Sequence, residues 1–333
     1  MFTCPPVCLT AQFSDNSGAL FLSLPIGAQA VGMGQTAVTM EGRGEAVFWN
    51  PAGLATMQSS EFAVENASLA AGNAHALTAY FPAHSFGVFG GAVYLLDYGS
   101  LDRTDSTNNV VAQIAPRNLE FLASYSAEIA GSLTLGINYK LVQTRLSCSG
   151  DCEAVASSQG TAHGFDLGGQ LNVGPDGALR LGVALKNIGL KLPDQADPLP
   201  ARLVLGALYR LGAHVAGSGA ARPRAGTPPN PGGEATAANG TGNGGIDVEV
   251  AADLDSPWRG EGESQMRFGV DVGYQRLVRV RGGYAFAGSG VSGPSFGMGL
   301  SSGAIGFDLA RTFASSSDFI DDNPTFFTFH LTF

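Results

Sequence analysis

Charged residues are scarce in this chain, and no part of the sequence is long and apolar enough to form a transmembrane helix. Charged residues make up 14% of the 333 residues, whereas a soluble globular chain carries about 25%. The absence of any run of about 18 consecutive apolar residues excludes a helical membrane protein. A closed β-barrel, in which all backbone groups pair between strands, is the other structure that can cross a bilayer.

Basic residues are in the minority, because 18 Lys and Arg stand against 28 Asp and Glu and give a net charge of −10. Binding to nucleic-acid phosphates needs clustered Lys and Arg, and the sequence has no such cluster. Nucleic acid is therefore excluded as a partner. Glycine, with 47 residues, is abundant, and high glycine with few charges favours a protein that contacts lipid on one face.

Cysteine is also scarce, and the four cysteines fall into two pairs. Cys4 and Cys8 lie near the start, and Cys148 and Cys152 lie in the polar segment SCSGDCE. A disulfide between Cys148 and Cys152 would close a small loop in an oxidising compartment. A metal site is the alternative, which is disfavoured because no second Cys or His pair lies nearby.

The sequence lacks a catalytic set. None of the five histidines belongs to a metal-spaced pair or lies beside a candidate nucleophile, and no G-x-S-x-G motif occurs. These histidines are His75, His84, His163, His214 and His330. We therefore expect that the protein is not an enzyme and uses no cofactor or metal.

Residues 1–12, MFTCPPVCLTAQ, do not form a complete secretory signal. Such a signal has a basic start and a longer apolar core, and here only Leu9-Thr10-Ala11 resembles its end. We interpret residues 1–12 as the remnant of a signal peptide; a short disordered leader is the alternative.

A continuous series of β-strands is expected from residue 61 onward. In residues 266–275, MRFGVDVGYQ, apolar side chains alternate with small or polar ones, and successive side chains of a strand point to opposite faces. Arg267 and Asp271 share the polar face, as do Arg279 and Arg281 on the following strand. The strands are about 9–11 residues long or longer, the length that a tilted strand needs to cross a bilayer.

The pattern predicts an all-β fold, a transmembrane antiparallel β-barrel of about 14 strands, over residues 61–333. The expected strands are 62–70, 75–82, 86–98, 118–130, 132–146, 162–174, 178–187, 201–215, 245–255, 265–275, 277–287, 294–301, 303–311 and 325–333. Short turns alternate with longer connections, as they do in bacterial barrels. Residues 217–244, rich in Gly, Pro and Ala, predict a disordered loop, which lies on the periplasmic side unless the count is wrong by one strand.

The chain ends on alternating apolar residues, with Phe329, Leu331 and Phe333 on one face. This ending resembles the C-terminal signal that the barrel-assembly machinery of Gram-negative outer membranes reads. It predicts that machinery and outer-membrane lipid as partners, and the outer membrane of a Gram-negative-type bacterium as the location.

Residues 19–57 are Gly-rich and lack strand alternation. Asn50 suits the N-cap and Pro51 the first position of a helix, so a short helix is expected to start there. A phosphate-binding loop is a rival interpretation of Gly32–Gly34, which is disfavoured because no strand precedes it and no suitably placed Lys follows.

Residues 27–38, GAQAVGMGQTAV, followed by residues 46–55, AVFWNPAGLA, resemble the N-terminal signature of PorV/PorQ-type barrels. Those barrels are similar in turn to FadL-like transporters of hydrophobic compounds, which share an Asn-Pro-Ala element. Residues 181–192 and 198–211 resemble the paired central strands of the family, and residues 268–286 and 296–311 resemble its closing strands, so the resemblance covers nearly the whole chain. The incomplete signal, the 217–244 insertion and the Cys148/Cys152 loop depart from the family pattern.

The resemblance implies a 14-stranded barrel whose N-terminal segment, residues 13–60, folds with short helices into the lumen as a plug. The expected plug and gate residues are Phe48, Trp49, Asn50, Pro51 and Gly53. We expect Arg267, Asp271, Arg279 and Arg281 to face the lumen. A cross-strand salt-bridge lattice is favoured for them over a substrate-selective ring.

Two functions follow from the resemblance. The PorV/PorQ-type features imply an accessory of type IX protein secretion that binds secreted cargo or partner proteins. The FadL-like element implies, as the alternative, a transporter of hydrophobic small molecules across the outer membrane. A structural barrel without cargo is the third possibility.

Overall fold

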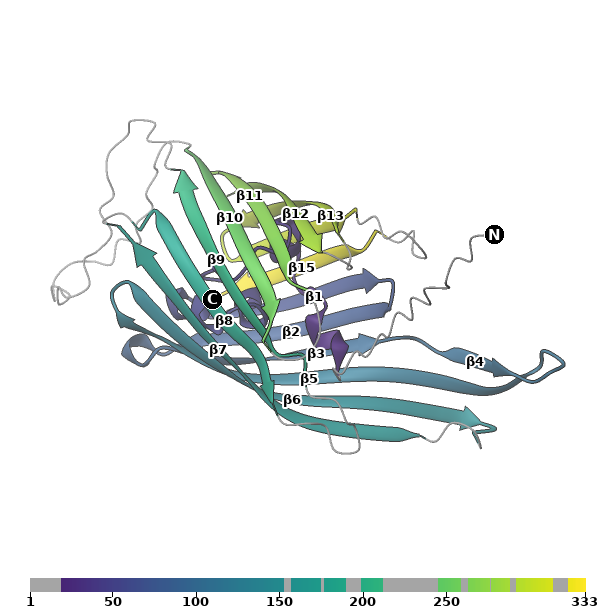
Figure 1. Cartoon of the computed structure of the whole chain (residues 1–333). Helices are drawn as coiled ribbons and strands as arrows, with labels where there is room; N and C mark the ends of the chain where they lie inside the picture. Colours follow the sequence, from purple (N-terminus) through teal and green to yellow (C-terminus); the bar gives the residue numbers. More distant parts are fainter. Residues whose placement is uncertain are drawn as a thin grey trace, which may run out of the picture.

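The strands close into a single antiparallel β-barrel, seen along its side in Figure 1. The computed structural model describes residues 19–152, 157–174, 177–189, 199–211, 245–258, 263–275, 277–287, 292–313 and 323–333. Strands pair with their neighbours in sequence, except that the third and fourth both pair with the fifth, and the first strand pairs with the last, with Glu61 opposite Thr332. This closure leaves no sheet edge open along the barrel wall.

Fifteen strand segments make up the wall. They are β1 (Glu61–Leu69), β2 (Gly72–Pro82), β3 (Val88–Asp97), β4 (Leu101–Thr104), β5 (Val110–Ala130), β6 (Leu133–Gly150), β7 (Ser158–Val173), β8 (Leu179–Gly189), β9 (Arg202–Leu211), β10 (Ile246–Pro257), β11 (Gln265–Tyr274), β12 (Val278–Ala287), β13 (Gly293–Ser302), β14 (Ile305–Thr312) and β15 (Thr325–Thr332). β3 and β4 both pair with β5, one after the other along its length, so they occupy one strand position in the wall. The barrel therefore has 14 strand positions around its circumference.

The predicted 14-stranded antiparallel barrel is therefore confirmed. The expected connection between strands 86–98 and 118–130 is wrong in part, because β4 and the first residues of β5 form a long hairpin there, which projects beyond the other strands in Figure 1. The alternation of apolar and polar residues is weak at the tip of this hairpin, because side chains there face solvent on both sides.

The wall is apolar outside and polar inside. Along β11, for example, Phe268 and Val270 are exposed on the outer face, whereas Arg267 and Asp271 are buried on the inner face. An apolar outer band with a polar interior is the pattern of barrels that cross bilayers. Among the described residues, no helix is long and apolar enough to cross a membrane.

The two rims differ. The C-terminal residue Phe333 exchanges backbone hydrogen bonds with Ser60 at one rim, which also carries the turn at 131–132 and which we call the turn rim. The opposite rim, which carries the tip of β4 and β5, is the loop rim. Because neighbouring strands are antiparallel, the end of β9 at Leu211 and the start of β10 at Ile246 both lie at the turn rim. The chain therefore leaves and re-enters the wall there. Residues 1–12, 13–18 and 217–244 lie outside the described residues.

A lysine in the lipid-facing band will test the position of the bilayer. Val270 lies midway along β11 on the outer face, whereas Ile246 on neighbouring β10 lies at the turn rim. We expect Val270→Lys to lower the free energy of unfolding by ~2–4 kcal/mol and the matched Ile246→Lys by ~0–1 kcal/mol, because the cost depends on depth. Denaturant titration in lipid vesicles measures both, and equal losses would contradict the assigned band.

Candidate functional site

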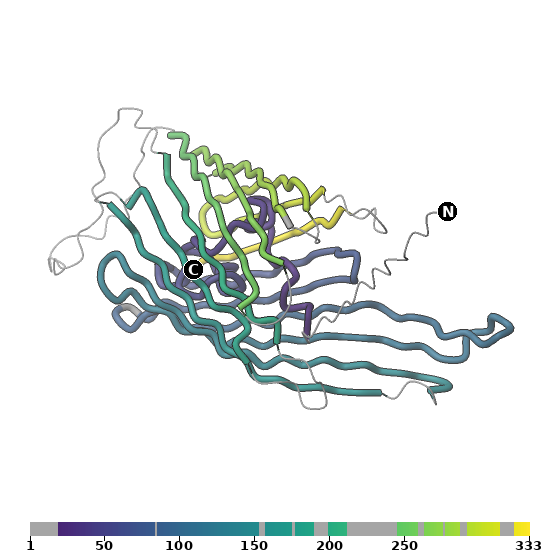
Figure 2. Tube along the Cα trace, in the orientation of Figure 1, coloured from purple at the N-terminus to yellow at the C-terminus, as the bar shows by residue number. Residues whose placement is uncertain are grey.

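A plug formed by the N-terminal segment occupies the barrel, as Figures 1 and 2 show in purple. Its helices are η1 (Leu20–Ser23), α1 (Ala28–Gly32), η2 (Gly44–Phe48) and η3 (Pro51–Thr56). Helix α1 packs against β12 to β15, η2 against β1 and β2, and η3 against β5 to β7. The plug therefore contacts the wall on several sides of the lumen.

Glycines on the inner face of the wall allow the plug backbone to lie directly against the strands. A Cβ atom added at any of these seven glycines would come within 2.9 Å of a plug atom. These residues, which we call the glycine belt, are Gly136, Gly168, Gly182, Gly206, Gly269, Gly283 and Gly297. Three pairs of them stand opposite one another across neighbouring strands, so the belt is continuous in places. Real Cβ atoms do not approach other atoms so closely, and the belt therefore explains part of the high glycine content.

Polar side chains of the wall satisfy the irregular backbone of the plug. Asp253 accepts hydrogen bonds from the backbone N–H groups of Ala37 and Val38, at 2.8 and 3.0 Å. Gln170 donates to the carbonyl oxygens of Val38 and Met40, at 3.0 and 2.8 Å. A buried backbone group without a partner is costly, so these side chains take the place of the pairing that a helix or sheet would give.

Asn50 joins the plug to the wall. It is fully buried, and its Oδ1 accepts from Ala52 N–H at 3.1 Å where η3 begins. Its Nδ2 donates to Val38 O at 2.6 Å and approaches Gly169 O and Val183 O on β7 and β8 at 3.3 Å. The same side chain therefore caps η3 and holds it to two strands.

The lumen charges predicted from the sequence are tied into ion pairs. Arg281 pairs with Asp271 at 2.8 Å and with Asp308 at 2.5 Å. Arg279 also pairs with Asp271, at 2.8 Å. Arg267 pairs with Asp255 at 2.8 Å. This arrangement is a salt-bridge lattice, since each named arginine is already held by wall carboxylates.

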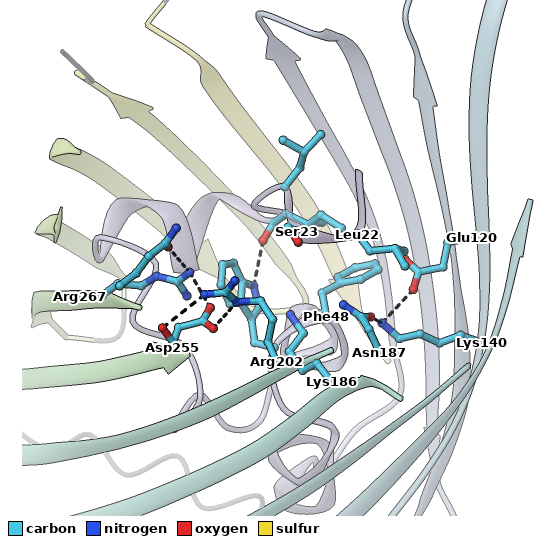
Figure 3. Close-up of a pocket in the computed structure, with 14 residues that line it drawn as sticks. Leu22, Ser23, Phe48, Glu120, Lys140, Lys186, Asn187, Arg202, Asp255 and Arg267 are labelled. Carbon is cyan, nitrogen blue, oxygen red and sulfur yellow. Dashed lines mark hydrogen bonds and ion pairs between the residues drawn. The ribbon is translucent and has the colours of Figure 1, made fainter. Parts of the chain in front are cut away.

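A small cavity lies between the plug and the wall, in the part shown in Figure 3. Its volume is about 60 Å³, room for a few water molecules. Apolar side chains of the plug line one side, and charged side chains of the wall line the other. The plug contributes Leu22, Leu24, Ile26, Phe48 and Trp49; the wall contributes Glu120, Lys140, Lys186, Asn187, Arg202, Asp255, Gln265 and Arg267.

Most charges around this cavity are paired, but Lys186 is an exception. Lys140 pairs with Glu120 and Asp166, both at 3.0 Å. Among the described residues Lys186 has no carboxylate or hydrogen-bond partner, and its Nζ lies 5.3 Å from the ring centroid of Trp49. The cavity thus combines an aromatic wall with one lysine that forms no direct ion pair among the described residues, although Asp166 and Asp255 act on its charge from a distance.

A larger cavity, of about 960 Å³, lies at the turn rim on the other side of the plug. Glu41 of the plug crosses it, forming ion pairs with Arg180 on β8 and with Arg210 on β9, the latter at 2.8 Å. Gln58 and Glu128 lie at its edge. Of the two cavities, the one at the turn rim is therefore much the larger.

The predicted plug and gate residues all lie in the plug but not all at the same site. Phe48 and Trp49 line the small cavity, Asn50 and Pro51 are buried against wall glycines, and Gly53 is buried against Met40 within the plug. Lys186 and the residues of the glycine belt were not singled out from the sequence. The belt had a usable signal, because its glycines occupy lumen-facing positions of the alternating pattern. No sequence signal identifies Lys186, because whether a lysine has an ion-pair partner depends on strands that are distant in the sequence.

Two further predicted features lie at opposite rims. Cys148 and Cys152 form a disulfide at the end of β6, at the loop rim. Phe329, Leu331 and Phe333 point outward at the C-terminal end of β15, by the turn rim. Among the described residues, no group of three or more His, Cys, Asp or Glu is arranged to hold a metal ion.

Known proteins of similar sequence do not identify the chain, because no protein-family model and no curated protein matches it. Solved structures do share its fold. The toluene transporter TodX of P. putida has a TM-score of 0.61 at 13% identity, over 92% of this chain and 98% of that chain. The Ralstonia pickettii toluene transporter TbuX gives 0.59 at 13%, over 92% and 98%. A Pseudomonas aeruginosa FadL homologue gives 0.55 at 12%, over 93% and 98%. The barrel thus has the fold of FadL-type transporters and channels.

Adding a methyl group to the glycine belt should loosen the plug. Gly283 faces Gly34 of the plug, whereas its neighbour Gly282 has open space around it. We expect Gly283→Ala to lower the free energy of unfolding by ~1–3 kcal/mol through overpacking, and Gly282→Ala to have little effect. Both substitutions have the same effect on the entropy of the unfolded chain, so a difference between them reports on the folded protein. Equal unfolding midpoints would refute the close approach of the plug to Gly283.

The stability of the plug should fall as the pH rises from about 5 to 8. Burial raises the pKa of the Glu45 carboxyl from 4.5 to about 8, although the Ala30 N–H donates to it at 2.7 Å. Between these values the unfolded chain has released its proton and the folded protein retains it, so a rise in pH favours unfolding. Glu45→Gln should flatten this dependence in denaturant titrations at several pH values, and an unchanged slope would contradict the assignment.

Proposed function

We propose that this protein is an outer-membrane channel of a Gram-negative-type bacterium that takes up hydrophobic small molecules. The observation that carries the proposal is the plug, which lies between a small cavity of about 60 Å³ and a larger one of about 960 Å³ at the turn rim. Support comes from the shared fold, since TodX and TbuX are toluene transporters. A plugged channel admits a ligand through movement of the plug and not through an open pore.

Entry requires the first part of the plug to move. The cavity of about 60 Å³ is smaller than the roughly 150 Å³ that accommodates benzene in an engineered protein cavity. Residues 19–26, which we call the strap, cover it. Among the described residues, the one hydrogen bond that reaches the strap from outside is donated by Trp49 Nε1 to Ile26 O, at 3.0 Å. Stacking of Phe21 on Tyr94, at 5.9 Å, holds its other end.

The chemistry of the cavity favours a ligand with an apolar body and a polar or acidic end. The apolar body would replace the strap side chains against Phe48 and Trp49. The acidic end would lie beside Lys186, which has no carboxylate partner among the described residues. A hydrocarbon without such a group would leave Lys186 without a direct counter-ion in a site closed off from water, which is unfavourable for a charged group.

The secretion role implied by the PorV/PorQ resemblance is the second candidate. The hairpin of β4 and β5 projects from the loop rim and is the surface that a secreted protein would reach first. Binding there would not involve the small cavity. The two functions therefore differ in which part of the barrel responds to a ligand.

Fluorescence of Trp49 offers a direct test, because the chain has only two tryptophans. Trp258 is half exposed at the loop rim, so Trp258→Phe leaves Trp49 as the sole reporter in the cavity. We expect an aromatic carboxylate to change the Trp49 emission of this variant and to be taken up by vesicles that contain it. Lys186→Met should weaken binding of the carboxylate by roughly tenfold, the loss of one charge-assisted contact, and leave binding of toluene unchanged.

Movement of the strap is tested by a matched pair of variants. Trp49→Phe removes the hydrogen bond to Ile26 and should speed uptake, whereas Trp258→Phe should not. No emission change with any small hydrophobic compound, together with binding of a secreted protein domain at the loop rim, would favour the secretion role instead.

A further inference from the structure

Two arginines stand side by side on the outer face of the wall, near the loop rim. Arg117 on β5 lies directly opposite Arg145 on β6, and both side chains are exposed. They point away from the lumen, because the inner face of β5 carries the buried residues Glu120 and Leu122. Like charges directly opposite in an antiparallel pair repel and destabilise the sheet.

The arginines lie just above the lipid-facing band. On β5 the outward apolar positions run from Leu119 to Ile129, and a tilted strand needs about 9–11 residues to cross the hydrocarbon core. Arg117 is the next outward position, about 7 Å further along the strand. The headgroup layer adds roughly 5–7 Å on each side of the core, so both guanidinium groups are at the level of the lipid headgroups.

The described protein neutralises only one of the two charges. Asp97 on β3 pairs with Arg117 at 3.1 Å, although 60% of the arginine side chain remains exposed. Among the described residues, Arg145 has no ion pair or hydrogen bond. Its neighbour across β7 is Gln159, an uncharged hydrogen-bonding side chain.

The lumen contains a comparable pair of like charges on directly opposite residues. Glu249 on β10 stands directly opposite Asp271 on β11. Arg279 lies between them, 3.8 Å from the first carboxylate and 2.8 Å from the second. There a third side chain supplies the missing counter-charge, whereas on the outer face no described side chain does so for Arg145.

We propose that Arg117 and Arg145 form a binding site for a phosphate group of a lipid headgroup in the outer leaflet. Guanidinium groups bind phosphate oxygens through paired N–H donors, and a phosphate between the two arginines removes their repulsion. The site faces the bilayer at headgroup height, so its occupant is a membrane lipid and not a ligand on its way through the lumen. The proposal is independent of what the channel carries.

The test uses the full chain purified in a neutral detergent and lipid A as the probe. Native mass spectrometry would compare lipid A that carries both phosphates with lipid A from which the phosphates have been removed. We expect the phosphorylated form to bind at lower concentration. Arg145→Gln should weaken it roughly fivefold and the double variant Arg117→Gln/Arg145→Gln roughly 30-fold, as expected for arginines near an anionic membrane surface.

Arg311 provides the matched control. It is an exposed arginine on β14 near the same rim, and a phenylalanine, not an arginine, lies opposite it on β13. Arg311→Gln removes the same charge and should leave lipid A binding unchanged. The site would be refuted by equal binding of the two lipid forms to the unaltered protein, or by equal losses in the Arg311 and Arg145 variants. The first comparison needs no variant and therefore holds even if a substitution impairs folding.

Discussion

The structure depends on one constraint: an irregular segment without strands must be buried inside a barrel without leaving its backbone polar groups unpaired. Two features of the wall meet it together. The glycine belt brings the strands close enough to the plug, and side chains such as Asp253 and Gln170 then reach its N–H and carbonyl groups. Either feature alone would fail, because a polar side chain cannot bridge a gap and a close approach without partners leaves buried groups unsatisfied.

This constraint divides the plug into two parts. From Ala28 to Asn50 the backbone and its caps are bonded to wall strands on several sides, including β15 through Thr328 and β10 through Asp253. The strap, by contrast, is held mainly by aromatic contacts and by the indole of Trp49. Segments with few hydrogen bonds open at lower free energy than those held by many. Displacement of the strap alone, the movement that we propose for ligand entry, therefore costs less free energy than ejection of the whole plug.

Most of the fold could be predicted from the sequence, because strand alternation is a local signal. All 14 strand positions of the wall were predicted. The errors lie where alternation is absent, as in β4, or at strand ends, as in β5 and β6. The site was less predictable. Alternation places Arg267 and Asp271 in the lumen, but their partners are decided by register and by distant strands. Lys186 resembles Lys140 in the sequence, and only the fold gives carboxylate partners to one of them.

The distribution of paired and unpaired cations then separates stabilising residues from candidate binding residues. Lumen arginines such as Arg281 are held between two carboxylates, and a charge that is already compensated gains little from a ligand. Lys186 and Arg145 lack such partners among the described residues, one at the cavity beneath the strap and the other at headgroup height. These two positions are therefore the ones that we propose as binding sites, the first for the acidic end of a ligand and the second for a lipid phosphate.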